Sequence, residues 1–303
     1  MDRSSAPSGA LGTPPALATV SRGGFSVTVE PPPLRARLAA QTVIEDLLDQ
    51  RVVPTRSPLA RLLGRSPLHG ESLAVFHGAK DDISVAAALA RIPAGWKVFH
   101  SLPVGKARSE IGHLVVGPNG VFTVTMRNAR GQNIWVFKRL LLVAGRSVSY
   151  LRDAELEAER ATRVLRKRMP QHHAVRPVIA LVNPREVVIR EKPSEVKVLN
   201  SRHLNAWLVR QPPVLNDREL VEIMTIVDDP KTWGAAPQVN AQEVMARFAA
   251  LDGDVSISRR RRLWWTSWAT VLVIAMVGVE AVVVLNVVTA MLADIGMQHP
   301  AGL

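Results

Sequence analysis

The sequence of 303 residues contains no cysteine. A chain without thiols forms no disulfide bonds, thiolate metal sites or cysteine nucleophiles, so any metal would need carboxylate or histidine ligands. No glycine-rich phosphate loop or Ser-His-Asp arrangement is present, and the first residues lack the apolar core of a signal peptide. These absences are compatible with a reducing cytoplasm, and they leave carboxylate chemistry or charge-based binding as the open classes of function.

Acidic residues are few relative to basic ones: 26 Asp and Glu against 38 Lys and Arg give a formal net charge of +12. Such an excess favours acidic partners, either nucleic acid or anionic lipid, unless it only reflects a proteome rich in arginine. Four of the cations stand together directly before an apolar run, where they set topology: Arg259, Arg260, Arg261 and Arg262. The other cations are spread along the chain, so contact with DNA or RNA is a hypothesis.

Residues 263–292 are almost wholly apolar, and about 20 helical residues are enough to cross the ~30 Å hydrocarbon core of a bilayer. No Lys or Arg follows this run, and it begins with three residues that favour the membrane interface: Trp264, Trp265 and Trp268. The pattern predicts a single-pass helix in the cell membrane, in contact with lipid, with the N-terminal part cytoplasmic and the C-terminus outside. Within the run, Glu280 either reaches water near the outer surface or links helices in a homo-oligomer or with a partner protein.

Composition divides the chain into six segments. We expect a disordered N-terminal segment at 1–34, an amphipathic helix and linker at 35–69, a globular domain at 70–235, a helix with a basic juxtamembrane segment at 236–262, the transmembrane helix at 263–292 and a short external tail at 293–303. The amphipathic helix could dock on the domain or lie on lipid, and docking on the domain is favoured.

Apolar periodicity in the globular segment predicts an α/β fold with a mixed sheet. A short helix is expected before Pro93, with a buried side formed by Ile83, Ala87, Leu89 and Ala90. A β-hairpin should follow, turning at Asn119-Gly120, because this pair tolerates positive φ angles. Further strands are predicted at 133–137, 140–145, 176–184 and 196–200, and helices at 151–169 and after the capping residue Asn216.

Several stretches of this segment carry a family pattern: GAKDD at 78–82, IGHLVVGPNGVFTVTMRN at 111–128, NIWV at 133–136, YLRDAELEAERATRVL at 150–165, AWLVRQPPVL at 206–215 and DDPKTW at 228–233. Over about residues 70–235 the chain resembles the nuclease-related domain (NERD) family, in the style of its actinobacterial members, within the PD-(D/E)xK nuclease superfamily. The resemblance implies a restriction-endonuclease-like mixed sheet flanked by helices.

The resemblance also implies where catalysis would take place. The family's chemistry would use an Asp on the first hairpin strand and a Glu-x-Lys on the second, because two carboxylates bind a divalent cation while the lysine positions the attacking water and the phosphate. The matching positions here are Gly112, Thr125 and Arg127. Glycine has no ligand, threonine is a weak neutral one, and arginine does not deprotonate to act as a base. These degraded positions predict an inactive centre with no cofactor.

Other polar residues stand near these positions. Asp82 occupies the place of a family helix Glu, Glu157 a place that is often Gln, and Glu110 shares a strand face with Gly112. Asp82 and Glu110 could form a substitute Mg²⁺ site. Four cations are predicted to bind nucleic acid: Arg127, Arg130, Lys138 and Arg139. Three hypotheses follow: an inactive nucleic-acid-binding module at the cytoplasmic membrane face, a metal-dependent DNA nuclease with a rearranged active site, or a protein-interaction scaffold.

Overall fold

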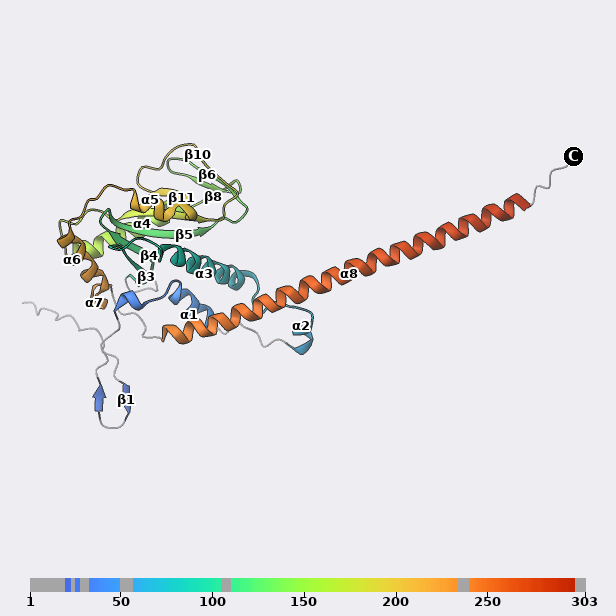
Figure 1. The fold of residues 1–303 in the computed structure, drawn as a ribbon, viewed down its shortest axis with the longest axis horizontal. Coiled ribbons are helices and arrows are strands. Elements are labelled where there is room, and N and C mark those ends of the chain that lie inside the picture. Colours follow the sequence, from blue (N-terminus) through green and yellow to red (C-terminus); the bar gives the residue numbers. More distant parts are fainter. Residues whose placement is uncertain are drawn as a thin grey trace, which may run out of the picture. The chain divides into compact units, whose positions relative to one another are not determined.

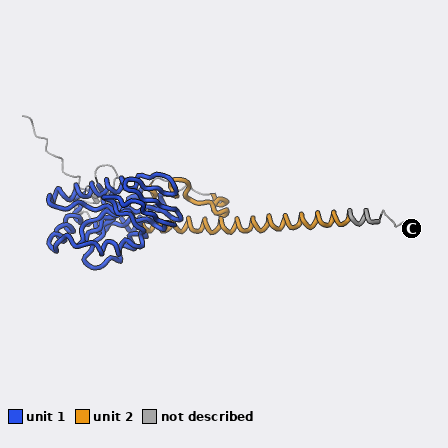
Figure 2. Tube along the Cα trace, turned by 90° about the horizontal axis from the view of Figure 1, so that it is seen from above, with its two compact units in different colours: residues 1–46, 74–244 blue, residues 47–73, 245–303 orange. Residues whose placement is uncertain are grey.

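A computed structural model describes residues 20–22, 25–27, 33–49, 57–104, 110–233 and 240–297. The chain divides into two compact units, which Figure 2 shows in blue and orange: unit 1 comprises Met1–Asp46 and Ala74–Val244, and unit 2 comprises Leu47–Leu73 and Met245–Leu303. Most of the segment 1–34, expected to be disordered, lies outside the described residues, as do residues 298–303 of the expected tail. Within the former, β1 (Val20–Arg22) and β2 (Phe25–Val27) form an antiparallel pair.

The centre of unit 1 is a five-stranded sheet in the order β11-β9-β5-β4-β3. Its strands are β3 (Lys97–Pro103), β4 (Glu110–Gly117), β5 (Gly120–Asn128), β9 (Arg176–Val182) and β11 (Lys197–Asn200). The first three strands pair antiparallel, whereas β9 is parallel to both β5 and β11. The predicted mixed sheet is therefore confirmed.

Helices cover both faces of this sheet (Figure 1). Helices α4 (Tyr150–Arg166), α6 (Asp217–Asp228) and α7 (Pro230–Trp233) share one apolar cluster with β3 and β4. Helices α3 (Gly70–Leu89) and α5 (Leu204–Val209) share a second cluster, with β5 and β9. Each face of the sheet is thus buried, as the apolar strand sequences require.

A second, four-stranded sheet has the order β10-β6-β7-β8. It comprises β6 (Asn133–Val136), β7 (Leu141–Val143), β8 (Arg146–Val148) and β10 (Glu186–Ile189). The strands expected at 133–137 and 140–145 form its antiparallel centre, and β10 adds to β6 in parallel. Its side chains have their own apolar cluster with the first turns of α4.

Two local expectations need correction. The hairpin turns at Pro118-Asn119, because Gly117 pairs with Gly120, and the positive φ of 119° falls on Gly120 as the first residue of β5. The helix expected before Pro93 is α3, which has 20 residues. Its buried side contains Asp81, Val85 and Leu89, while Ala87 and Ala90 are exposed. The spacing of apolar residues predicted the wrong face, because one of the buried positions, Asp81, is a charged residue.

The segment before the domain docks on unit 1. It contains a 3-10 turn (Leu34–Ala36) and α1 (Gln41–Asp49). Arg35 pairs with Asp228 at 3.2 Å, and the Arg37 Nε donates to the Ser101 carbonyl oxygen at 2.7 Å. Leu34 joins the apolar cluster beneath α4. Residues 34–46 therefore pack on the domain, as was favoured from the sequence.

Unit 2 contains α2 (Pro58–Leu62) and most of α8 (Ala241–Met297), a continuous helix of 57 residues (Figure 1). The expected juxtamembrane helix and transmembrane helix are parts of this one element. By length and composition, α8 is able to cross a membrane. Its large apolar side chains between Leu263 and Val288 are exposed, which is compatible with a membrane anchor.

Candidate functional site

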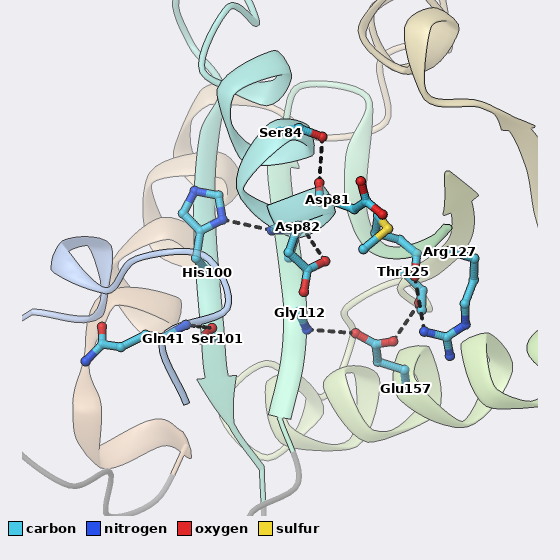
Figure 3. Close-up of polar contacts among 12 residues, drawn as sticks. Gln41, Asp81, Asp82, Ser84, His100, Ser101, Gly112, Thr125, Arg127 and Glu157 are labelled. Atoms are coloured by element: carbon cyan, nitrogen blue, oxygen red, sulfur yellow. Dashed lines mark hydrogen bonds and ion pairs between the residues drawn. The ribbon is translucent and has the colours of Figure 1, made fainter. Parts of the chain in front are cut away.

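The hairpin of β4 and β5 and helix α4 bring together three of the residues singled out in the sequence: Gly112, Thr125 and Glu157. Gly112 precedes His113 on β4, and Thr125 follows Val124 on β5. His113 and Val124 face each other across the two strands. From α4, one carboxylate oxygen of Glu157 accepts the Gly112 N–H at 3.0 Å, and the other accepts the Thr125 hydroxyl at 2.6 Å (Figure 3). A single carboxylate from the neighbouring helix thus joins both positions.

The surroundings of Glu157 act on its charge in opposite directions. Burial raises the pKa of Glu157, while the hydrogen bonds from Thr125 and Gly112 and the charges of Arg127 and His113 lower it, leaving a net rise. Both carboxylate oxygens already accept hydrogen bonds inside the protein. This carboxylate is held as a structural link between strand and helix.

Glu110 lies two residues before Gly112 on β4. Burial raises the pKa of Glu110, and the charges of Asp82 and Glu157 raise it further, against a hydrogen bond from Thr42 and the charge of Arg37. Its Oε2 is buried without a hydrogen-bond partner. Over the described ranges, however, no group of three His, Asp or Glu side chains could hold a metal ion.

Asp82 also lies beside a histidine pair. Its Oδ1 lies 3.7 Å from Nε2 of the fully buried His113. The Nδ1 atoms of His113 and His100 are 2.9 Å apart, so one ring donates to the other. Burial, with the neighbouring His113, lowers the pKa of His100 to about 4. His100 is therefore neutral at physiological pH, and the pair acts as a polar link between β3 and β4.

Asp81 is a site residue that sequence reasoning missed. Its buried carboxylate accepts a hydrogen bond from the Asn128 side chain at the end of β5, and lies 3.8 Å from the Arg130 guanidinium. The signal was available in the spacing of Asp81, Val85 and Leu89, four residues apart along one side of a helix. This residue holds α3 against the end of the hairpin.

The four cations predicted to bind nucleic acid fall into two pairs. Arg127 and Arg130 lie at the end of the hairpin. The Arg127 guanidinium is 4.8 Å from the Tyr150 ring centre and 3.7 Å from the Asp153 carboxylate, and the Arg130 guanidinium is 3.8 Å from the Asp81 carboxylate. Lys138 and Arg139 line an open groove of about 1090 Å³ along α4. Six cations line this groove against three glutamates: Lys138, Arg139, Arg152, Arg163, Arg166 and Lys167, with Glu155, Glu159 and Glu195.

The residues predicted to set membrane topology lie together on α8. Trp264 contacts both Trp265 and Trp268, with ring centres 4.9 and 5.9 Å apart. The four arginines immediately precede them in the same helix.

Comparison with known proteins bears on unit 1. A search of curated proteins finds no match. A solved structure, that of Pyrococcus furiosus SfsA in complex with Ca²⁺, shares 14% identity and has a TM-score of 0.20, over 52% of this chain and 54% of that one. The chain thus spans about half the length of that protein, and a likeness at this level carries no argument. Residues 77–182 match the family model of the nuclease-related domain. This stretch, which includes the hairpin, α4 and the Glu157 link, is therefore similar to the nuclease-related domain.

Proposed function

We propose that this protein is a membrane-anchored nuclease-related domain that binds nucleic acid at the cytoplasmic membrane face without cleaving it. The observation that carries the proposal is the Glu157 link, in which one carboxylate accepts hydrogen bonds from Gly112 and Thr125. Both are positions where the family resemblance expects carboxylates that bind a cation.

The loss of cleavage follows from the chemistry of these groups. A divalent cation requires several oxygen ligands with free lone pairs directed at one point. Glu157 uses its oxygens within the protein, and Gly112 and Thr125 supply no charge. Arg127, at the lysine position, lies beside Asp153, and a guanidinium group is not suited to act as a base. No group at these three positions is suited to hold a cation or to deprotonate water.

Binding is supported by the groove along α4, whose cations exceed its acids by three. A surface of this kind attracts phosphates, and each phosphate contact releases counterions from the nucleic acid. The apolar part of α8, preceded by four arginines, supports the anchor and its orientation. Such an anchor would hold the groove close to the membrane and restrict binding to nucleic acid that approaches it.

The test uses the full chain in nanodiscs of neutral lipid and labelled single- and double-stranded DNA, at several salt concentrations, with and without Mg²⁺. We expect affinity that falls with salt, and no cleavage. Lys138→Ala with Arg139→Ala should weaken binding and reduce the salt slope by about 1 to 2, since each phosphate contact contributes roughly 0.9 for duplex DNA. Arg91→Ala with Arg218→Ala removes the same charge from exposed positions outside the groove and should change the slope less.

Two outcomes would contradict this proposal. Cleavage that EDTA stops and that Glu110→Ala or Asp82→Ala abolishes would favour the rearranged metal-dependent nuclease. Neither binding nor cleavage would leave the protein-interaction scaffold.

A further inference from the structure

Within unit 2, the short helix α2 contacts α8 where the apolar run begins. The indole Nε1 of Trp265 donates to the Leu62 carbonyl oxygen at 2.9 Å, and a guanidinium nitrogen of Arg261 donates to the Arg61 carbonyl oxygen at 2.9 Å. The last carbonyl groups of a helix lack intrahelical donors, and α8 supplies donors to these two. The C-terminal end of α2 is therefore held at the level of Trp265.

Gly64, just after α2, allows a close backbone approach. It has a φ of 71°, and a Cβ atom there would lie 2.5 Å from the Arg262 nitrogen and 2.7 Å from the Ser258 oxygen. Both atoms belong to the backbone of α8 and cannot move aside. Only glycine combines this φ with this contact, so the position of α2 along α8 depends on Gly64.

Held in this position, α2 exposes apolar side chains. Leu59, Leu62 and Leu63 are 64%, 55% and 47% exposed. Trp264 and Trp268 on the adjoining turns of α8 are each 56% exposed. Exposed apolar side chains gathered beside a span mark a surface that meets a partner or a membrane.

The charges beside these leucines favour a lipid surface as the partner. Residues 57–65 and 255–279 contain six arginines and no Asp or Glu: Arg61, Arg65, Arg259, Arg260, Arg261 and Arg262. Trp265 lies two residues past Leu263, or about 3 Å along the helix axis, at the depth where indoles occupy the membrane interface. Leucines and arginines at this depth match the acyl boundary and the anionic headgroups of a cytoplasmic leaflet.

We propose that α2 is a second membrane-contacting element, an interfacial helix that places Leu59, Leu62 and Leu63 in the acyl boundary while the arginines bind anionic headgroups. This inference rests on the proposed membrane anchor. Clamped to α8 through Gly64, α2 widens the membrane contact from a single helix to two elements, which limits rotation and tilt of the span relative to the bilayer surface.

The absence of cysteine makes a direct test possible in the full chain. Single variants Leu59→Cys and Ile274→Cys, each carrying a spin label, are reconstituted into phosphatidylcholine vesicles with and without phosphatidylglycerol. Accessibility to oxygen, which partitions into lipid, is compared with accessibility to a water-soluble nickel chelate. We expect both labels to be accessible to oxygen and protected from nickel, with greater protection at position 59 when phosphatidylglycerol is present.

A matched pair of glycine variants tests the clamp. Adding Gly64→Ala to Leu59→Cys should abolish the protection from nickel. Gly70→Ala should leave it intact, because Gly70 also has a positive φ, of 52°, but nothing lies within 4 Å of its Cβ position. An unchanged label at position 274 shows that the protein remains inserted in both variants.

The outcomes separate the two proposals. If position 274 lies in lipid while position 59 is open to nickel, α2 does not contact the membrane and the inference is overturned, whereas the anchor stands. A label at position 59 that is shielded from both reagents indicates cover by protein and overturns it as well. If position 274 is itself open to nickel, the proposed anchor fails.

Discussion

Removing the Glu157 link should destabilise unit 1 measurably. Glu157→Ala deletes the acceptor of the Gly112 N–H and of the Thr125 hydroxyl, which lie on separate strands. Hydrogen bonds to a charged group contribute about 1.5 to 3 kcal/mol each, and access of water to this partly buried site offsets some of the loss. We expect the free energy of opening to fall by about 2 to 4 kcal/mol.

Hydrogen exchange of the full chain in nanodiscs is the appropriate assay, because it reports the opening of residues 110–128 separately from α8. Thr125→Val removes one of the two bonds and should cost about 1 to 3 kcal/mol, since a carboxylate oxygen loses its donor. Glu159→Ala is the matched control, because Glu159 is an exposed glutamate two residues along the same helix. If Glu157→Ala changes the opening free energy no more than this control, within about 0.5 kcal/mol, the link has no structural role.

Three further predictions concern pH and packing. Because the pKa of Glu157 is raised in the folded protein, the wild type loses stability as pH rises through that pKa and the carboxyl group ionises. Glu157→Gln cannot ionise and should therefore gain stability relative to the wild type between acidic and neutral pH. A difference in unfolding free energy between the two proteins that does not change with pH would contradict this. The pKa of His100 is about 4 in the folded protein and 6.5 in the unfolded chain, so its contribution to stability is present above pH 6.5 and is lost as pH falls toward 4. The loss is on the order of 2 to 3 kcal/mol. His100→Phe should flatten that part of the pH profile of stability measured by urea unfolding. Asp81→Ala should cost about 0.5 to 1.5 kcal/mol in the same unfolding assay, because the hydrogen bond between the buried Asp81 carboxylate and the exposed Asn128 amide is lost, whereas Arg130→Ala should cost less.

Sequence patterns predicted the strands and helices well where the pattern is local. The strands at 176–184 and 196–200 are continuous apolar runs, and β9 and β11 occupy them. The capping box predicted at Asn216 is present, with both of its hydrogen bonds to Glu219. Failures occurred where a tertiary contact reversed a local preference, as with the buried Asp81 on α3 and the turn at Pro118-Asn119.

The candidate site was predicted in its components but not in its connections. The sequence singled out Gly112, Thr125 and Glu157 as separate family positions, and the structure joins all three through one carboxylate. Glu157 is 45 residues from Gly112 and 32 from Thr125 along the chain. No periodicity specifies which of several glutamates on α4 reaches the hairpin, because that depends on how the helix packs across the sheet.

By itself, the sequence determined the α/β class, the mixed sheet and the long apolar helix, because alternation, helical spacing and apolar length are properties of neighbouring residues. Only the tertiary structure decided that Glu157 joins Gly112 and Thr125, that Lys138 and Arg139 line a groove apart from Arg127, and that Gly64 holds α2 against α8. These are contacts between distant segments, and packing geometry selects them from many pairings that the sequence allows equally.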